Sequence, residues 1–417
     1  MKILKEIKKC RGCSSNNIKL VLKLAKTPIG EDFRKKINLK PKKYKLDLYQ
    51  CKTCGLAQIK QVVNPKLLYN DYLYQTNTST NLKSHFKQYA KDILKYLNIK
   101  KKITIVDLGS NDGTFLENFK FKGHNVIGVE PARKICNISK RKKIFTINSF
   151  FNKFVSLKII KKFGYPEIVT ANNVLANVDN LDLWIKNIVR LIDNEGVFIF
   201  ESFSLLDLIK NKVVDFIYHE HLSIFSAKSI KSICERNGLK LFHIQRVSTK
   251  GGSFRYFITS ESNKKIKITK SIKRILNLEI KYKIFKKLPF INLKNLILKN
   301  KKLIHKHIKS NYIKGKKIIG VGASISCITL KYQLNLENKI NYLIDDNDLK
   351  NKMFSPGKNI PIIKTSDFQF SKNNILIILA WRFKDYIFKR HFKKIKGTII
   401  DAWPKVKKYN KIKLNEV

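Results

Sequence analysis

Residues 103–130 read ITIVDLGSNDGTFLENFKFKGHNVIGVE, and this stretch decides the fold. A β-branched run ends at Asp107 and is followed by Gly109 and Gly113. A segment with helical spacing then leads to a second apolar run, which ends in Glu130. Strand, glycine loop, helix, strand and terminal acid are the layout of a nucleoside-binding βαβ unit, whose acid accepts hydrogen bonds from ribose hydroxyls.

The glycines of this loop do not fit two common phosphate-binding patterns. The dinucleotide pattern Gly-x-Gly-x-x-Gly requires a glycine where Asn111 stands, and no lysine follows Gly113 as it would in a P-loop. The spacing Asp107-x-Gly109-x-x-x-Gly113 instead resembles motif I of class I S-adenosylmethionine (SAM) methyltransferases. A structural turn with a chance pair of glycines is the alternative.

Length and composition indicate a globular, multidomain chain. A length of 417 residues suggests two or three domains, and a hydrophobic fraction of 43% is ordinary for globular proteins. No apolar run approaches the roughly 20 residues that cross a bilayer, and the first residues, MKILKEIKKC, lack the apolar centre of a signal peptide. We therefore expect a cytoplasmic protein with no membrane partner, and the sequence leaves its oligomeric state open.

The net charge of +56 raises the question of a nucleic-acid partner. Lysine far outnumbers arginine and is spread over the whole chain, as adenine- and thymine-rich coding would produce at surface positions. We therefore interpret the charge as solvated lysine-rich faces. Weak, nonspecific binding of polyanions at low salt is expected, but no specific nucleic-acid partner.

Four of the seven cysteines form the pairs Cys10-x-x-Cys13 and Cys51-x-x-Cys54. Each pair can direct two sulfurs at one ion, and four thiolates are the tetrahedral set that zinc prefers. Because four cysteines leave no open coordination position, the pattern predicts a structural Zn²⁺. The surrounding segment has little apolar content, so its folding would depend on the metal. Redox-active thiols are the alternative.

Patterning along the chain predicts an α/β protein with four segments. Alternating strand and helix signals predict a doubly wound, Rossmann-like core over residues 76–262, after a zinc module over residues 1–75. The spacing of its glycine loop makes this core resemble a class I methyltransferase. Residues 263–310 have the apolar spacing of a helical connector, broken near Leu288-Pro289. Residues 311–417 repeat the strand–glycine–helix order and predict a second Rossmann-like domain.

The segment Tyr218-His219-Glu220-His221 is the densest in proton-transfer groups. If the segment is extended or turning, Tyr218 and Glu220 lie on one face while His219 and His221 lie on the other. His221 can act as a general base on a proton made acidic by a neighbouring carbonyl, with Glu220 either orienting it or holding substrate. A histidine with a purely structural role is the alternative.

Further candidates follow predicted strands or join segments. Asn172 and Asn173 end one strand and Glu201 ends another, at the sheet edge where open α/β sheets bind ligands. Tyr72 and Tyr74 lie between the zinc module and the core, where they either cover the cleft or pack in the interior.

Residues 250–255 read KGGSFR. Two glycines followed by a hydroxyl and a guanidinium can bring Ser253 and Arg255 close to a ligand. A plain hairpin turn fits the same residues equally well.

Taken together, these motifs resemble the sugar C-methyltransferases that act on nucleotide-linked deoxysugars. The resemblance covers nearly the whole chain, and its motifs after the cysteine pairs are VDLGSNDG, GVEP, TANNVLANV, IYHEHLSIFS, KGGSFRYF, GVGA and SPGKNIPI. It implies a SAM-binding middle domain, with Gly109 and Asn111 at the methionine end, Glu130 at the ribose and Phe151 near the adenine. The expected cofactor contacts are Asp107, Gly109, Asn111, Gly113, Glu130, Phe151, Asn172 and Asn173.

The resemblance also implies how the substrate is held and methylated. The C-terminal domain would help to hold the nucleotide, and His221 would be the base, with Tyr218, Glu220 and Tyr72 beside it. Removal of the proton next to a ketone would give an enolate that attacks the methyl group of SAM, without a catalytic metal. The expected substrate contacts are Tyr74, Glu201, Ser253, Arg255, Gly320 and Gly322.

Two positions depart from the pattern of that family. Asn177 stands where members often carry histidine, and the loop GVGASIS lacks the lysine that is common after its alanine. O-methylation of a sugar or related metabolite remains an alternative function. A zinc-bearing nucleic-acid-binding protein is a third, although it leaves the Tyr-His-Glu-His segment unexplained.

Overall fold

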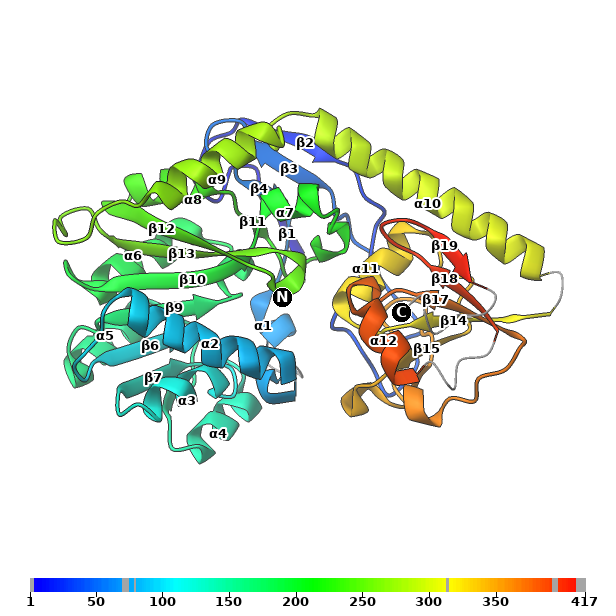
Figure 1. Ribbon diagram of the computed structural model, residues 1–417, viewed down its shortest axis with the longest axis horizontal. Helices are drawn as coiled ribbons and strands as arrows, with labels where there is room; N and C mark the ends of the chain where they lie inside the picture. The colour runs from blue at the N-terminus through cyan, green and yellow to red at the C-terminus, as the bar shows by residue number, and fades with distance from the viewer. Residues whose placement is uncertain (1–3, 70–74, 79, 313–314, 392–396, 410–417) are drawn as a thin grey trace.

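The computed structural model describes residues 4–69, 75–78, 80–312, 315–391 and 397–409, and it forms two α/β lobes (Figure 1). A small N-terminal module and a long helix connect the lobes. Tyr72 and Tyr74, expected at the catalytic and substrate sites, lie outside the described residues. In the ranges given above, no helix is both long and apolar enough to cross a membrane.

The larger lobe is built on a seven-stranded sheet of order β12-β13-β10-β9-β6-β7-β8. All neighbouring strands are parallel except β13, which runs antiparallel to both β10 and β12. The strands are β6 (Thr104–Leu108), β7 (Asn125–Val129), β8 (Phe145–Ile147), β9 (Ile168–Asn172), β10 (Val197–Phe203), β12 (Leu239–Val247) and β13 (Ser253–Ser260).

Helices cover both faces of this sheet, which explains why its central strands are apolar on both sides. Ile105 packs in one core cluster with Phe86 and Phe115, whereas its neighbour Val106 packs in another with Ile188. The helices of the lobe are α2 (Thr80–Tyr96), α3 (Thr114–Lys120), α4 (Arg133–Arg141), α5 (Lys153–Phe163), α6 (Leu181–Ile192), α7 (Leu205–Lys210) and α8 (Ala227–Glu235).

The smaller lobe repeats this plan with a six-stranded sheet of order β16-β15-β14-β17-β18-β19. Its strands are β14 (Lys317–Val321), β15 (Tyr342–Asp345), β16 (Ile362–Lys364), β17 (Asn374–Ile378), β18 (Thr398–Asp401) and the antiparallel β19 (Lys407–Tyr409). Its helices are α11 (Ile325–Gln333) and α12 (Lys384–His391). Strand order reverses between β6 and β9 in the larger sheet and between β14 and β17 in this one, and such switch points create ligand crevices.

The N-terminal module shares its main sheet with the larger lobe. Strands β2, β3 and β4 are antiparallel, and β4 also pairs with β11 (Ser223–Ile224), which directly follows the Tyr-His-Glu-His segment. The other elements of the module are β1 (Leu4–Glu6), β2 (Ile18–Leu22), β3 (Leu48–Cys51), β4 (Ala57–Ile59), β5 (Gln61–Val63) and α1 (Pro65–Tyr69).

The segment between β2 and β3 extends to the smaller lobe. Ala25 N donates a 2.8 Å hydrogen bond to Gln333 Oε1, and Asn38 N donates a 3.0 Å bond to Asn359 Oδ1. The module therefore contacts both lobes and helps to set their relative position.

Two helices join the lobes where the sequence predicts a broken helical connector. Helix α9 (Lys270–Lys281) packs on β12, and α10 (Leu288–Tyr312) runs along the molecule to the smaller lobe (Figure 1). The break lies at residues 282–287, and Pro289 falls in the first turn of α10, where its missing N–H costs no helical hydrogen bond.

Candidate active site

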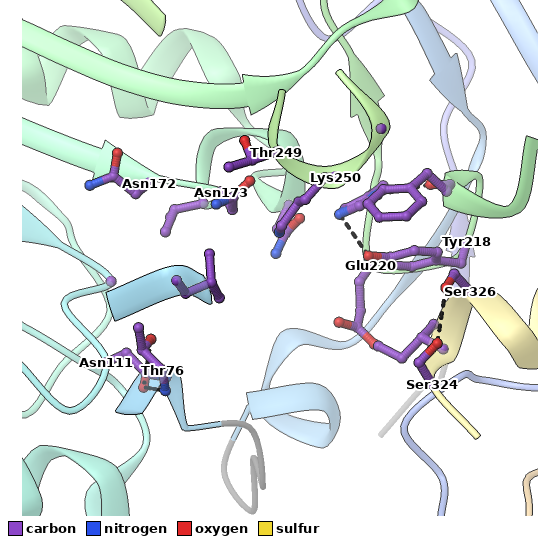
Figure 2. A pocket seen from close by; sticks show the side chains of 18 of the residues that line it. Thr76, Asn111, Asn172, Asn173, Tyr218, Glu220, Thr249, Lys250, Ser324 and Ser326 are labelled. Atoms are coloured by element: carbon purple, nitrogen blue, oxygen red, sulfur yellow. Dashed lines mark hydrogen bonds between the residues drawn. The ribbon is translucent and has the colours of Figure 1, made fainter. Parts of the chain in front are cut away.

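A cavity of about 1500 Å³ lies between the two lobes. The carboxyl ends of the larger sheet reach it through Asp107 and Asn172, and those of the smaller sheet reach it through Asp345 and Asp401. Both switch points therefore open into one space, which is the expected place for ligands of open α/β sheets. Figure 2 shows residues from both sides of this cavity.

The glycine loop after β6 forms one end of the cavity. Gly109 has φ of 72°, and a β-carbon there would collide with the Val174 side chain, so the position requires glycine. Glu130 fixes the loop because Oε2 accepts a 3.0 Å bond from Asn111 N and Oε1 accepts a 2.8 Å bond from Ala132 N.

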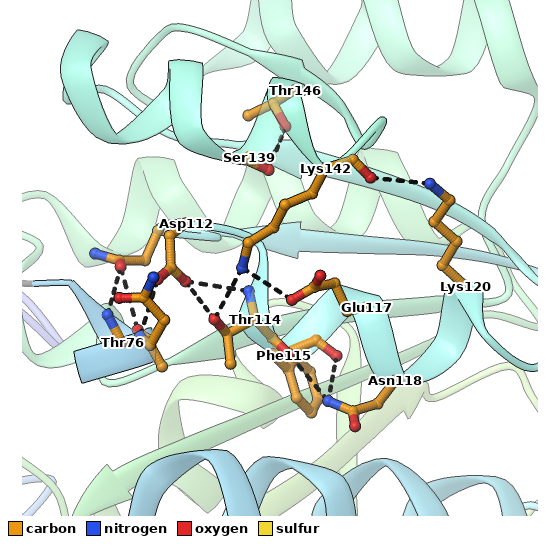
Figure 3. Close-up of polar contacts among 12 residues, drawn as sticks. Thr76, Asp112, Thr114, Phe115, Glu117, Asn118, Lys120, Ser139, Lys142 and Thr146 are labelled. Atoms are coloured by element: carbon orange, nitrogen blue, oxygen red, sulfur yellow. Dashed lines mark hydrogen bonds and ion pairs between the residues drawn. The ribbon is translucent and has the colours of Figure 1, made fainter. Parts of the chain in front are cut away.

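A short 3₁₀ turn, η1 (Thr76–Thr78), holds the same loop from the opposite side (Figure 3). Thr76 N donates a 2.9 Å hydrogen bond to Asn111 Oδ1, and Asn77 N donates one of 2.9 Å to Asp112 Oδ2. Asp112 also accepts from Thr114 N at 3.1 Å. Hydrogen bonds within the protein thus hold the loop on both sides.

The donors and acceptors around this loop fit SAM. Burial raises the pKa of Asp107 to about 7 and that of Glu130 to about 7, and an ionised carboxylate there can accept hydrogen bonds from ribose hydroxyls. Among the described residues, the buried Asn172 Oδ1 has no hydrogen-bond partner and can accept from an ammonium group. Phe151, in edge contact with Trp184 at 5.2 Å, gives an apolar wall suited to adenine.

The Tyr-His-Glu-His segment forms a turn, so the expected alternation of its side chains is wrong. His221 N donates a 2.9 Å hydrogen bond to Tyr218 O, and the turn brings Tyr218, Glu220 and His221 to the cavity wall together. His219 lies on the other side, where Nε2 is 3.1 Å from Lys45 O. Burial lowers the pKa of His219 to about 4.

Hydrogen bonds fix the tautomer of His221. Nδ1 lies 2.8 Å from the Phe216 carbonyl oxygen, which can only accept, so Nδ1 carries the hydrogen. Nε2 then holds the lone pair and accepts from the Tyr218 hydroxyl at 3.0 Å. Since both ring nitrogens are bonded to other groups, Glu220 does not orient His221 in this state.

Burial keeps the acid and the base of this segment neutral. Burial and the charge of Lys250 lower the pKa of His221 to about 3, so its imidazole is neutral at neutral pH. Burial and repulsion from Glu31 raise the pKa of Glu220 well above its usual range, and it can donate a hydrogen bond. Within the described part of the chain, Glu220 Oε1 has no partner.

Of the 16 expected catalytic, cofactor and substrate residues with described positions, ten line the cavity and six do not. Glu201 is buried behind it, where it accepts from Thr249 Oγ1 at 2.8 Å and lies 2.9 Å from His85 Nε2. Arg255 is also buried, 3.3 Å from Glu201 and stacked over Tyr89. Ser253 Oγ donates to the backbone oxygen of Thr249.

The other three are glycines that permit close packing. A β-carbon at Gly113 would meet Ser139 and Ile144 of the α4 region, and one at Gly320 would meet core leucines. Gly322 has φ of 104° and lies close to Ala380. These positions shape the loops but do not border the cavity.

Residues of the smaller lobe complete the wall and were not predicted. Lys350, Trp381 and Arg382 line the cavity, as do Ser324 and Ser326 at the start of α11. Trp381 and Arg382 follow the buried strand β17. Residues that follow a parallel strand lie at the edge where such sheets bind ligands, which is how Asn172 was singled out, and the same argument would have identified these two.

The four paired cysteines form one cluster outside the cavity. Cys10 Sγ lies 3.6 Å from Cys54 Sγ, Cys13 Sγ lies 3.5 Å from Cys51 Sγ, and all four sulfurs lie within 4.8 Å of one another. A tetrahedron with Zn–S bonds of about 2.3 Å has sulfurs separated by about 3.8 Å, so the cluster fits zinc. The hydrogen bond with Cys54 lowers the pKa of Cys10 to about 5.

The fold and the site together define a SAM-dependent methyltransferase with a structural zinc site. A family profile described as "Methyltransferase domain" matches residues 82–244, and one described as "Putative zinc binding domain" matches residues 10–69. A third, "C-methyltransferase C-terminal domain", matches residues 248–404. The chain therefore matches a zinc-binding domain, a methyltransferase domain and a C-methyltransferase C-terminal domain, in that order.

One curated relative matches this chain over nearly the whole length of both proteins. The chain is 24% identical over 388 residues to the C-methyltransferase NovU of Streptomyces niveus, covering 91% of each chain. Among solved structures, the magnesium protoporphyrin IX methyltransferase ChlM from Synechocystis with bound SAM is 14% identical, covering 42% of this chain and 79% of that one, with a TM-score of 0.32. The PH0226 protein of Pyrococcus horikoshii is 14% identical, covering 45% and 94%, with a TM-score of 0.36.

Proposed function

We propose that the enzyme methylates a carbon next to the ketone of a nucleotide-linked deoxysugar, with His221 as the base. One observation carries this proposal: a neutral imidazole with its lone pair on Nε2 lines the cavity between the two sheet edges. Such a group can accept a proton at neutral pH, and because its low pKa makes it a weak base, the transfer depends on stabilisation of the enolate. The relative that is named a C-methyltransferase supports transfer to carbon.

The smaller lobe is suited to hold the nucleotide end of this substrate. Asp345 Oδ2 accepts from Ala323 N at 2.6 Å and Oδ1 accepts from Asn347 N at 3.0 Å, which repeats the two backbone bonds of Glu130. The amino end of α11 and the cations Lys350 and Arg382 border the same part of the cavity. Helix amino ends and cations together favour phosphate groups.

The chemistry assigned to this chain is proton transfer and positioning. SAM, when bound, supplies a methyl group that is already activated by its sulfonium. The Tyr218 hydroxyl turns away from His221 Nε2, which then takes the proton while the C–H electron pair passes into the enolate. The same carbon forms the bond to the methyl group, and the bond from that methyl group to the sulfonium sulfur breaks with its electron pair left on sulfur, which gives S-adenosylhomocysteine. The Nδ1–H group keeps donating its hydrogen bond to the Phe216 carbonyl oxygen, which favours the imidazolium as it forms. Neutral Glu220 donates a hydrogen bond to the sugar.

Asn177 has a binding role in this scheme. It lines the cavity, and among the residues that the structure describes its buried Oδ1 has no hydrogen-bond partner. An amide cannot move a proton at neutral pH, so Asn177 accepts a hydrogen bond from a sugar hydroxyl or amine. We also assign the enzyme to the cytoplasm, where reducing conditions keep the four zinc-binding thiols free.

A single assay tests the proposal. Purified enzyme is incubated with methyl-labelled SAM and a panel of thymidine, uridine, cytidine and guanosine diphosphate 4-keto-6-deoxyhexoses, and products are identified by NMR. We expect a new C–CH₃ group, and about a 10²- to 10⁴-fold lower rate for His221→Ala with unchanged SAM affinity.

Two results would contradict it. Methyl transfer to oxygen at a rate indifferent to His221→Ala would instead assign an O-methyltransferase. Tight, salt-sensitive RNA binding without turnover of any sugar would favour a nucleic-acid-binding protein. Asn16→Ala, an exposed change in the zinc module, is the matched control and should leave the rate unchanged.

A further inference from the structure

We propose that Lys250 is a second catalytic residue, whose ammonium group stabilises the enolate oxygen during deprotonation. The assignment rests on the proposed function, because it requires a ketone in the cavity. The mechanism places negative charge on that oxygen as the carbon loses its proton, and a fixed cation beside it would lower the barrier.

Lys250 lies on the cavity wall in the turn η4 (Thr249–Gly251), which joins β12 to β13. In the view of Figure 2 its side chain lies between Asn173, which directly follows β9, and Glu220. Glu220 belongs to the Tyr-His-Glu-His segment, residues 218–221, which we call the base segment. Lys250 is a half-buried residue, and its Nζ makes no hydrogen bond and no ion pair within 4 Å among the described residues. A cation at such a position is available to a ligand.

The turn is rigid and holds Lys250 in an unfavourable conformation. Lys250 has φ of 56° and ψ of 26°, a left-handed conformation that costs a non-glycine residue roughly 1–2 kcal/mol. Asn211 Nδ2 donates a 2.7 Å bond to Gly251 O, and Thr249 is fixed by Glu201 and Ser253. Strain that the surroundings maintain is typical of residues at functional sites.

The charges around Lys250 leave its own charge largely uncompensated. The charged groups that face it are Glu201 from β10, Glu220 from the base segment and Arg382 from the smaller lobe. Glu201 already lies against Arg255 and His85, and Glu220 is neutral because its pKa is raised. Burial lowers the pKa of Lys250 to about 8, so the ammonium form still prevails at neutral pH.

The same charge acts on both partners of the proton transfer, since it favours the enolate and opposes the imidazolium. It disfavours a second cation nearby, and it therefore contributes to the neutral state of His221 before the reaction. When the α-proton moves to His221 Nε2, the new negative charge on the ketone oxygen accepts a hydrogen bond from Lys250 Nζ. The oxygen becomes a carbonyl again when the carbon takes the methyl group, and the ammonium group is unchanged.

Exchange of the substrate α-proton in D₂O isolates this step. With S-adenosylhomocysteine in place of SAM no methyl group can be transferred, and NMR follows exchange on the keto sugar that the wild type methylates best. We expect Lys250→Met to lower both exchange and methylation about 100-fold, and Lys250→Arg to restore both to within about tenfold of wild type. Lys283→Met is the matched control, an exposed lysine with φ of 52°, and should match wild type.

The pH profile gives a readout that a structural role would not change. Wild-type exchange should fall as pH rises through about 8, because the ammonium group loses its proton. Arginine keeps its charge across this range, so Lys250→Arg should lack that decline.

Three outcomes decide against the assignment. Exchange by Lys250→Met within threefold of wild type overturns it, while loss of exchange in His221→Ala leaves the proposed function standing. A borohydride-trapped adduct on Lys250, with no rescue by arginine, overturns it in favour of imine chemistry. A wild type that neither exchanges nor methylates any sugar of the panel removes the proposed function itself.

Discussion

Glu130 holds the glycine loop through two backbone hydrogen bonds while its carboxyl group borders the cavity. Asp107 lies nearby, and the pKa of each is raised to about 7 by burial. Ribose hydroxyls donate hydrogen bonds, so they prefer the ionised carboxylate. These two residues therefore link cofactor binding to pH in the neutral range.

We expect the affinity for SAM to rise between pH 6 and pH 8, as the carboxyl groups with raised pKa lose their protons. Isothermal titration calorimetry at pH 6, 7 and 8 measures this change. Glu130→Gln should weaken binding by about 10- to 100-fold and reduce the pH dependence, since a charge-assisted hydrogen bond contributes about 1.5–3 kcal/mol. A wild-type affinity that is the same at all three values would contradict the expectation.

Single residues were predictable where a strand end or a spacing rule identified them. Glu130 and Asn172 were singled out in this way and His221 by the density of proton-transfer groups around it; all three line the cavity, and their roles stay predictions. Arg255 was expected at the substrate, but an arginine that neutralises a buried acid has the same sequence signature as one that binds a ligand. The structure distinguishes these two roles, because Arg255 is buried away from the cavity against Glu201 and Tyr89.

At the scale of elements, local apolar runs predicted the parallel strands well. The runs at 103–106, 126–129, 168–170 and 197–200 correspond to β6, β7, β9 and β10. Pairing between distant segments was not predictable, because side-chain periodicity carries no information about the partner strand. Two pairings could not be predicted for this reason: that of β11 with β4, and the antiparallel insertion of β13 beside β10.

The zinc cluster and the base segment are connected through one sheet. Two of the four cysteines lie at or near the end of β3, β3 pairs with β4, and β4 pairs with β11, which begins two residues after His221. Loss of the metal should therefore disturb residues 218–221. The glycine loop after β6 has no such connection to the zinc cluster and should stay in place.

We expect Cys51→Ser, or treatment with a strong chelator, to release one zinc ion per chain and to abolish methylation. SAM affinity should stay within about threefold of wild type. Atomic emission measures the metal and calorimetry measures the cofactor, and Cys136→Ser, a buried cysteine outside the cluster, serves as the control. Full methylation by the zinc-free protein would show that the metal does not support the base segment.

At the scale of the whole molecule, Arg382 connects the lobes beside the cavity. Its Nη1 lies 2.6 Å from Asp215 Oδ2 in the larger lobe and its Nη2 lies 3.1 Å from Ser326 Oγ in the smaller. The guanidinium also lies 4.3 Å from the ring centre of Phe216, whose carbonyl orients His221. Under the proposed function, contacts at the nucleotide end of the substrate can therefore reach His221.

Arg382→Ala should raise KM for the sugar nucleotide about tenfold and should increase hydrogen–deuterium exchange in residues 215–221. SAM affinity should not change, and Arg382→Lys should recover part of the KM because it keeps a cation near Asp215. Kinetics and mass spectrometry measure these effects. Unaltered exchange in residues 215–221 would mean that the guanidinium does not stabilise this segment.

The large positive charge of the molecule has a separate consequence. With 86 basic and 30 acidic side chains spread over the sequence, we expect RNA to bind weakly near 50 mM salt and to be released by about 200 mM salt. Fluorescence anisotropy with an unstructured RNA measures this. Binding that persists at higher salt, or that inhibits methylation there, would indicate a dedicated site.

The pairing of β4 with β11 affects how the chain is made. The ribosome completes β4 early and β11 only after most of the larger sheet, a delay of roughly 10–30 s at typical synthesis rates. During that time the edge of β4 has no partner on that side, and unpaired strand edges promote aggregation. Zinc capture by the nascent module would order its first strands meanwhile, so metal supply during translation should govern the yield of folded enzyme more strongly than metal added afterwards.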